Sequence, residues 1–450
     1  MSLKISRVLH AGYIVESSDA RIIFDPIFEN PFSVNCYAFP EIQFDIEAIR
    51  NQKFDAVFIS HYHDDHCSFE SLKLLNRDTP LYMYCIYDEM FLLLQQLGFN
   101  RVYPLALGQA VDVGCIKVKP VRALDADVDV MFHIQSGGLN ILNVVDSWID
   151  DTILQQLSLT KWDLILWPFQ LMREIEVLAP RRFSTTEISL PAEWREQLAK
   201  LSPKSLVPSS CQFKFENWSW LNHAFFPMTY RKFHDAVSTL LPKTRQFRLN
   251  PGNSLLLGSD VCEYSDSLEW ITPVGNQDAD YTFEPERKVP STSEVAKHLD
   301  GLSTEQIRKV LKFCEEELPR IYSVMGPSHE LYFNKTRLWR LSLFDDLGSP
   351  THCIYRLDGE KLETVISSDD LTAEWVTEIP MVKLYGAIEN GESLTSLYIR
   401  INDTVFDDEI EKQLGETDLL EDPLLRCLYA GKFASFQKTQ LRRITDRQNR

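Results

Sequence analysis

The sequence lacks the features that mark several special classes of protein. No uninterrupted apolar stretch approaches the ~20 residues of a membrane-spanning helix, and the first residues lack the apolar core of a signal peptide. Basic residues are outnumbered 46 to 65, and the resulting net charge of −19 argues against a nucleic-acid or anionic-membrane partner. The nine cysteines are scattered and include no Cys-x-x-Cys pair, which favours reduced thiols and a cytoplasmic location.

What is present is the composition of a globular protein, with 44% hydrophobic and 25% charged residues. A chain of 450 residues is too long for one ordinary domain. Proline and polar residues dominate positions 273–295, a composition typical of a connector. We therefore expect a first domain over residues 1–265, a linker over 266–300 and a smaller α+β domain over 301–450.

The N-terminal half alternates short apolar runs with helical patterns, which predicts an α/β fold of two mixed sheets under helices. In the second half, Ser303 and Gln306 form a capping box, and the helix that follows is expected to stop at Pro319. An Asp-Gly hairpin is expected over residues 355–362 and a strand over 395–401. Earlier strands are expected over residues 6–15, 21–24, 56–59, 116–121, 130–134, 139–145, 164–167 and 205–207, and helices over 69–75 and 88–97.

The most informative stretch is His61–His66, which holds three imidazoles and two carboxylates in six positions. It follows the apolar run Ala56–Ile59, so we expect it on the loop that leaves a buried strand, where α/β sheets place their sites. Histidine and carboxylate are ligands for zinc, iron and manganese. The alternative is a solvated polar turn, but three of ten histidines within six residues favour a metal site. We interpret the adjacent Cys67 as a core residue rather than a reactive thiol.

The pattern H-x-H-x-D-H, formed by His61, His63, Asp65 and His66, resembles the signature of the metallo-β-lactamase superfamily. Residues 8–12 and 22–26 are similar to the opening of the branch that includes the ascorbate-phosphate lactonases, and residues 144–147 resemble the element whose aspartate bridges two metals. The resemblance covers residues 1–260 and implies a metallo-β-lactamase αββα sandwich.

The resemblance also implies roles for individual residues. His61 and His63 would hold one metal ion, Asp65 and His66 a second, and Asp146 would bridge the two. Asp65 and Asp146 would then be the catalytic carboxylates.

Groups around the metals are implied in the same way. Asp25 and His10 would orient metal-binding imidazoles through hydrogen bonds, with a turn-capping aspartate and a core histidine as the alternatives. Aromatic residues in neighbouring segments either shape a substrate pocket or pack in the core, and core packing is the default. They are Tyr62, Phe169, Trp218 and Trp220.

Two histidines of the family pattern are missing. Where the third metal-binding element should end in histidine, Asp125 stands instead, with Asp127 close by, and we interpret His133 in the next strand as structural. The fifth element, at residues 206–211, also lacks histidine, and His223 is either a substitute ligand or a loop residue. Asp125 and His223 complete the predicted ligand set.

A site rich in carboxylates favours two iron ions, with zinc or manganese as alternatives. The arrangement resembles that of the metallo-β-lactamase-fold di-iron β-hydroxylases and of the CMP-N-acetylneuraminate hydroxylase-type proteins, but the Rieske cluster of the latter is absent. The favoured hypothesis is a di-iron oxygenase that hydroxylates a small molecule with electrons from an external donor. The alternatives are a hydrolase of a phosphoester, lactone or amide that uses a metal-bridging hydroxide, and a degenerate site in a scaffold or carrier protein.

The end of the chain is weakly similar to sterol-carrier-like domains, through residues 382–386 and 397–401. Three roles are open for this unit: covering the pocket, presenting a carrier surface, or supporting a homodimer.

Overall fold

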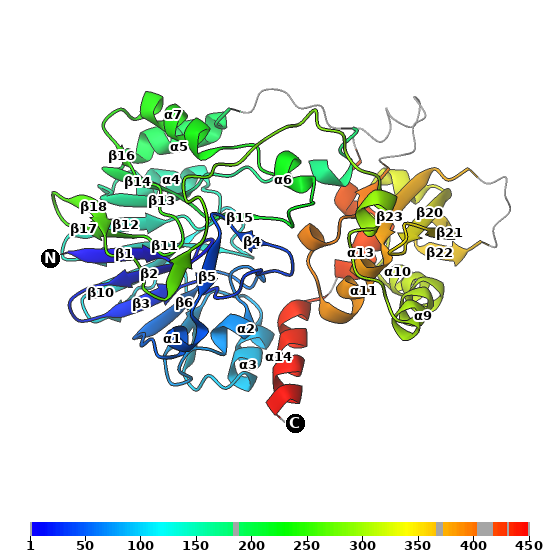
Figure 1. Cartoon of the computed structure of the whole chain (residues 1–450), viewed down its shortest axis with the longest axis horizontal. Coiled ribbons are helices and arrows are strands. Elements are labelled where there is room, and N and C mark those ends of the chain that lie inside the picture. Colours follow the sequence, from blue (N-terminus) through cyan, green and yellow to red (C-terminus); the bar gives the residue numbers. More distant parts are fainter. Residues whose placement is uncertain (1, 183–188, 366–371, 403–416, 430–431, 449–450) are drawn as a thin grey trace.

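The computed structural model describes residues 2–182, 189–365, 372–402, 417–429 and 432–448. Two large sheets packed face to face form a first unit, and a five-stranded sheet with its own helices forms a second unit beside it (Figure 1). Within these residues no helix has the length and apolar character needed to cross a membrane.

The first large sheet has eight strands in the order β18-β17-β1-β2-β3-β6-β7-β8. Its antiparallel part brings distant segments together, because β1 pairs with both β2 and β17. From β3 to β8 the strands are parallel. The bounds are β1 (Leu3–Arg7), β2 (Tyr13–Glu16), β3 (Arg21–Phe24), β6 (Ala56–Ile59), β7 (Leu81–Met83), β8 (Val102–Pro104), β17 (Ser254–Leu257) and β18 (Cys262–Ser265).

The second large sheet has seven strands in the order β16-β14-β13-β12-β11-β10-β9. Strands β9 to β12 form an antiparallel meander, and β12, β13, β14 and β16 run parallel. The bounds are β9 (Val111–Val113), β10 (Ile116–Arg122), β11 (Val130–Ser136), β12 (Leu139–Asn143), β13 (Leu164–Pro168), β14 (Ser205–Ser209) and β16 (Arg245–Gln246).

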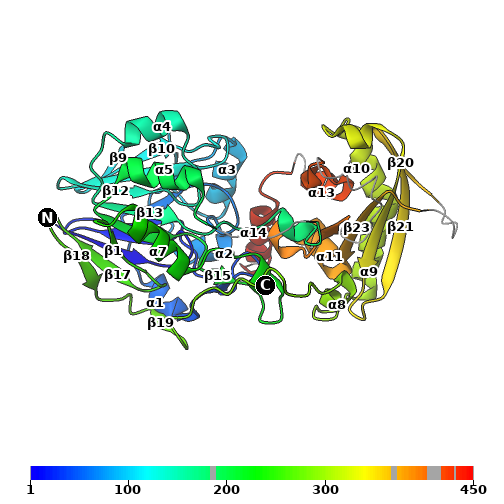
Figure 2. The ribbon, with the colours of Figure 1, turned by 90° about the horizontal axis from the view of Figure 1, so that it is seen from above.

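Strand β6 shows how the layers are held. Ala56 and Phe58 face the core between the two sheets, whereas Val57 and Ile59 face the core under the helices. Because both faces are covered, the strand is apolar throughout. Helices flank both sheets (Figure 2), as expected for an αββα sandwich. They are α1 (Ile46–Arg50), α2 (Phe69–Leu72), α3 (Asp88–Gln96), α4 (Asp151–Leu157), α5 (Ala192–Leu201), α6 (Leu221–Ala224) and α7 (Tyr230–Leu240).

Two small ribbons close the edge of the sandwich. Strand β4 (Tyr37–Ala38) pairs with β15 (Phe213–Lys214), and β5 (Ile42–Phe44) pairs with β19 (Ile271–Pro273). The expected linker over 266–300 thus contains an ordered strand, and it also contains α8 (Thr292–Ala296).

The second unit is built on a sheet of order β22-β21-β20-β23-β24 with a separate apolar core. The predicted Asp-Gly hairpin is present, since Asp358 pairs with Lys361 across the turn. The strands are β20 (Arg337–Phe344), β21 (Pro350–Asp358), β22 (Lys361–Thr364), β23 (Trp375–Pro380) and β24 (Arg400–Ile401). The helices are α9 (Thr304–Lys312), α10 (Leu318–Val324), α11 (Met381–Asn390), α13 (Pro423–Tyr429) and α14 (Ser435–Gln448).

Three expected elements differ in the structure. The strand expected over 6–15 is two strands, because the chain turns at residues 8–12. The helix after Ser303 does not stop at Pro319. A π-helical turn over Phe313–Glu317 leads into α10, whose first turn contains Pro319, a position that needs no backbone N–H donor. Residues 395–401 form a short 3₁₀ turn and only a two-residue strand, and every side chain from 396 to 401 is buried.

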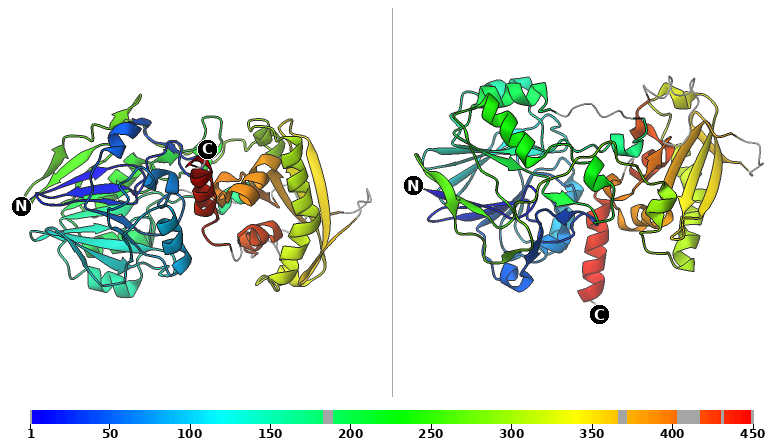
Figure 3. Two further views of the ribbon diagram at one scale, coloured as in Figure 1. Left: turned by 90° about the horizontal axis from the view of Figure 1, so that it is seen from below. Right: turned by 45° about the horizontal axis from the view of Figure 1, so that its top comes forward.

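The last helix, α14, leaves the second unit and packs against α2 and α3 of the first, while it also contacts α11. Figure 3 shows it lying at the junction of the two units.

Candidate metal centre

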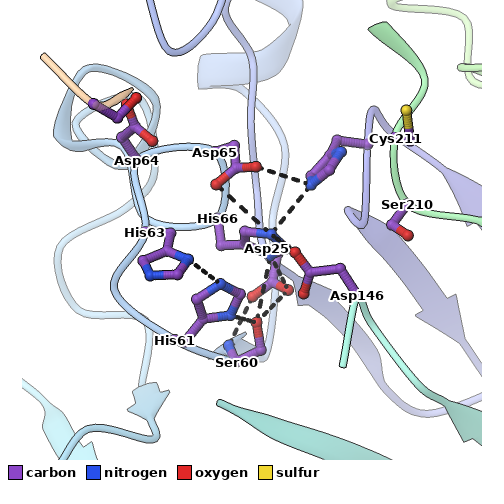
Figure 4. A network of polar contacts seen from close by, with 12 residues as sticks. Asp25, Ser60, His61, His63, Asp64, Asp65, His66, Asp146, Ser210 and Cys211 are labelled. Carbon is purple, nitrogen blue, oxygen red and sulfur yellow. Dashed lines mark hydrogen bonds and ion pairs between the residues drawn. The ribbon is translucent and has the colours of Figure 1, made fainter. Parts of the chain in front are cut away.

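Loops from both large sheets meet at one end of the sandwich (Figure 4). They follow β1, β3, β6, β12 and β14 and carry His10, Asp25, the histidine cluster, Asp146 and Cys211. Five non-glycine residues in these loops have left-handed backbone angles: His10 (φ 54°), Asp25 (φ 38°), Val145 (φ 62°), Ser210 (φ 49°) and Cys211 (φ 52°). Such conformations cost of order 1–3 kcal/mol each and concentrate at functional sites.

Four residues from three of these loops bring metal-ligand atoms close together. One ligand atom each of His10, Asp65, His66 and Asp146 lies within 4.8 Å of all the others. The Nε2 atom of His66 lies 3.1 Å from both His10 Nε2 and Asp146 Oδ2, and His10 Nε2 lies 3.2 Å from Asp65 Oδ2. These spacings fit a shared ion, because ligands ~2.0–2.2 Å from one metal lie about 3–3.6 Å from each other.

Two further features support the fit of a metal ion at this group. Two imidazole Nε2 atoms face each other at 3.1 Å, an arrangement in which at most one can donate a proton to the other. Asp146 Oδ1 is buried and has no hydrogen-bond partner among the described residues. A buried carboxylate oxygen without a partner is costly, and a cation would satisfy it.

His61 and His63 form a second pair beside this group. Their Nε2 and Nδ1 atoms are 3.1 Å apart, and their rings meet edge to face. His61 is buried, whereas His63 is exposed on the cavity side. The pair fits the role of ligands to a neighbouring ion.

Asp25 and Ser60 orient the histidines from behind. Asp25 Oδ2 lies 3.1 Å from His66 Nδ1 and accepts a 2.7 Å hydrogen bond from the Ser60 hydroxyl, whose oxygen lies 2.9 Å from His61 Nδ1. The backbone N–H of Ser60 donates to the other Asp25 oxygen. Fixing Nδ1 in this way leaves the Nε2 atoms of both rings facing the site. The orienting role expected for Asp25 thus matches the geometry.

Arg7 holds the loop that carries His10. Its guanidinium is fully buried and donates five hydrogen bonds to four carbonyl oxygens, those of His10, Pro208, Ser210 and Leu249. Two of these bonds, of 2.6 and 3.1 Å, go to His10. This role could not be predicted from the sequence, since an arginine at the end of a strand resembles a surface residue.

The histidines and carboxylates of this cluster shift one another's pKa values. Burial disfavours a charged imidazole at His66, but the Asp146 and Asp65 carboxylates outweigh burial and hold the His66 pKa well above its usual value. Burial likewise disfavours a charged Asp146, yet His66 and His61 hold the Asp146 pKa well below its usual range. Burial and the neighbouring His66 keep the pKa of His61 far below 6.5.

These shifts predict how metal binding depends on pH. With a raised pKa, His66 stabilises the metal-free fold fully below pH 6.5, and this contribution is lost as the pH rises through the folded-state pKa. A metal needs the neutral imidazole, so binding at pH 7 should release about one proton from His66, and affinity should rise up to about tenfold per pH unit. Calorimetric titration in buffers of different ionisation enthalpy measures this release. No proton release at pH 7 would contradict the assignment of His66.

The centre opens on a cavity of about 330 Å³ between the two units. From the first unit, the lining includes His63, Asp65, Asp146, Met172 and Phe213. The remainder comes from the second unit and includes Ser393, Thr395, Tyr429, Lys432 and Gln437. Of the three roles open for the C-terminal unit, the structure therefore shows that it covers the site.

The structure does not bring all predicted ligands together. Asp125 is exposed at the turn after β10, where its carbonyl accepts hydrogen bonds from Val128 and Asp129, and Asp127 is also exposed. His223 lies on α6, with Nδ1 3.7 Å from Glu284 Oε2. Neither Asp125 nor His223 belongs to the ligand group found among the described residues, nor do they line its cavity.

His10 is found where sequence reasoning did not place it. It was expected to orient other imidazoles, but its Nε2 lies among the ligand atoms themselves. The turn at Gly12 brings it there. His133 is structural, as expected, since its Nε2 lies 3.0 Å from Asn140 Oδ1 within the second sheet.

Among the four aromatic residues considered, only Tyr62 lines the cavity. Phe169 is buried against Tyr230, and Trp218 stacks on His298. Cys67 is fully buried, and burial raises the pKa of its thiol, which fits a core residue.

Residues 4–171 match the beta-lactamase superfamily domain. The chain therefore contains a domain of this superfamily, and its sandwich is the metallo-β-lactamase fold. The match ends before β14, so the second unit lies outside it.

The curated relatives include hydroxylases of cytidine monophosphate-N-acetylneuraminic acid. The mouse enzyme is 29% identical over 153 residues, which cover 32% of this chain and 26% of the relative. The pig enzyme is 30% identical over 146 residues, which cover 30% of this chain and 33% of the relative. The aligned region thus spans between a quarter and a third of these relatives.

Similar solved structures include a metallo hydrolase from Ignicoccus hospitalis, with 17% identity, a TM-score of 0.41 and coverage of 57% of this chain and 99% of that one. Another is a diiron beta-hydroxylase from Streptomyces venezuelae, with 16% identity, a TM-score of 0.40 and coverage of 57% of this chain and 53% of that one.

Proposed function

We propose that the protein is a dinuclear metal enzyme, with iron as the favoured metal, that hydroxylates a small molecule held between its two units. The observation that carries the proposal is the group formed by His10, Asp65, His66 and Asp146, of which Asp65 and Asp146 line the cavity. The curated relatives that are hydroxylases support the choice of reaction.

In this proposal each residue has a distinct task. His61 and His63 hold one ion, and His10, Asp65 and His66 hold the other. Asp146 would bind between the two ions, a role supported by its Oδ2 facing His66 and by its Oδ1, which makes no hydrogen bond among the described residues. The bound ions would supply Lewis acidity and, as iron, the redox chemistry that activates dioxygen. The four nitrogen donors also suit zinc.

The cavity suggests the kind of substrate. A volume of about 330 Å³ suits a small molecule. Apolar side chains of Tyr62, Met172 and Phe213 offer one surface, while Ser393 and Lys432 on the second unit offer polar groups. We propose that an external donor supplies the electrons.

Metal analysis of protein purified without added metal tests the proposal. We expect two iron ions per chain, and uptake of dioxygen when the iron protein is chemically reduced. Substituting Asp146→Ala should lower the metal content. Stoichiometric zinc, with no dioxygen uptake, would refute the oxygenase.

A metal-dependent hydrolase is the second candidate, because Asp65 and Asp146 both line the cavity, and ions held by them would supply a hydroxide and polarise a phosphoester, lactone or amide. Turnover of p-nitrophenyl acetate or bis(p-nitrophenyl) phosphate by the zinc protein, abolished in Asp65→Asn, would favour it.

A further inference from the structure

Helix α14 brings two buried amides to the loop that carries the metal-binding histidines. Gln437 is 2% exposed and Gln440 is 4% exposed. They lie more than 370 positions from the loop in sequence, and neither is a metal-ligand type. Burying an amide is costly unless it is hydrogen-bonded. The hydrogen-bond partners of Gln437 and Gln440 therefore indicate what each side chain does.

Gln437 ties together the two ends of the ligand loop. Its Nε2 donates to the carbonyl of Tyr62 at 2.8 Å and to the carbonyl of Cys67 at 2.9 Å. Both partners are acceptors, so the two hydrogens of one amide group are both used. Between these carbonyls lie His63, Asp65 and His66. One side chain therefore sets the separation of the points where this segment begins and ends.

Gln440 fixes the segment just after it. Its Oε1 accepts from the backbone N–H of Phe69 at 2.7 Å, and its Nε2 donates to the Ser68 hydroxyl at 2.9 Å. Ser68 is the N-cap of α2 but makes no side-chain cap hydrogen bond of its own. A four-residue helix is not stable alone, and these two hydrogen bonds from α14 add to the core packing of α2 by capping its first turn.

The helix is seated by further contacts. The Phe433 ring just before it packs against Tyr62 and Tyr87 at centroid distances of 4.8 and 4.4 Å. Lys438 pairs with Glu89 at 2.9 Å. Since Gln437 also lines the cavity, the element that closes the cavity and the element that holds the ligand loop are the same.

We propose that Gln437 is a positioning residue for the metal centre, so that the seating of α14 sets the metal affinity of a site in the other unit. The inference rests on the proposed function only in requiring that a metal binds at the cluster. Gln437 itself binds no metal. It acts through the backbone of residues 62–67.

Cobalt(II) binding to the full-length chain tests this proposal. Gln437→Met keeps the length and helix propensity of the side chain but removes both donors. We expect Co²⁺ affinity to fall about 10- to 100-fold, as when groups that support metal ligands are removed, with a changed visible Co²⁺ spectrum. Gln440→Met should show a smaller loss of the same kind. Thr445→Ala is the matched control, because Thr445 is exposed on the same helix and its hydroxyl donates to the Leu441 carbonyl within that helix.

Hydrogen exchange of the metal-free proteins separates this proposal from the proposed function. Faster exchange over residues 61–69 in Gln437→Met, but not in Thr445→Ala, is expected whether or not metal binds. If the unaltered protein binds no Co²⁺, the proposed function fails. If, in addition, exchange over residues 61–69 is the same in Gln437→Met as in the unaltered protein, the positioning role is overturned as well. The proposal is overturned if folded Gln437→Met protein binds Co²⁺ with native affinity and a native spectrum. Gln437 would then have a structural role only, even if the variant has a lower Tm.

Discussion

Replacing His66 with alanine is expected to remove metal from the centre and abolish activity. His66 contacts His10, Asp146 and Asp25 directly, through both ring nitrogens. Its loss takes a ligand from the group and also leaves Asp25 and Asp146 without their imidazole. Breaking a buried charge pair on one side costs about 3–5 kcal/mol, so the metal-free variant should also unfold more easily at pH 6.

His223→Ala is the matched control for this variant. It also removes a histidine, but one that lies on α6 beside Glu284. Metal content per chain, measured by elemental analysis, should stay unchanged in His223→Ala and fall in His66→Ala. Metal loss in both variants would restore His223 to the ligand set, and two retained metals in His66→Ala would exclude the proposed centre.

The sequence predicted the first unit well because its signals are local. An apolar strand followed by His61–His66 places the cluster at the end of β6, and periodicity identified β3 and β6 of the first sheet and β10 to β14 of the second. These features depend on neighbours in the chain. The expected beta-lactamase superfamily domain is confirmed over residues 4–171.

The ligand set was harder to predict, because it depends on which loops meet. Asp125 was chosen for its place in a family pattern, yet the turn after β10 leaves it exposed. His10 was placed behind the site because nothing local shows that the β1–β2 turn reverses toward His66. Its position depends on Arg7, whose partners lie on segments about 200 residues away.

The second unit shows the same limit at longer range. Its hairpin and capping box were visible as short motifs, and both are present. The position of the second unit over the cavity could not be predicted from such motifs, because it depends on contacts between residues 61–69 and residues 433–440. Hydrophobic periodicity reports that α14 has a buried side but not which surface it meets.

Gly12→Ala is expected to damage both the fold and the metal centre. A Cβ at this position would lie 2.7 Å from the Asp25 carbonyl oxygen and 2.9 Å from the Leu9 carbonyl oxygen. Both are backbone atoms, so no side-chain rotation relieves the overlap. We expect a loss of about 2–3 kcal/mol in the free energy of unfolding.

The damage should reach the metal because Gly12 lies where the turn carrying His10 touches the end of β3. The Gly12 N–H donates to Leu9, and its carbonyl accepts from Val8, which closes the turn. Forcing this turn away from Asp25 separates His10 from His66, which Asp25 holds. Metal affinity should therefore fall about 10- to 100-fold.

Gly258→Ala provides the control, because the nearest atom to an added Cβ there is the Val261 carbonyl at 3.9 Å. It should change stability by less than about 0.5 kcal/mol and leave metal affinity unchanged. Chemical denaturation and metal titration of the two variants measure both effects. A Gly12→Ala protein that is destabilised but binds metal normally would show that His10 is held by Arg7 alone and that its approach to Asp25 does not matter.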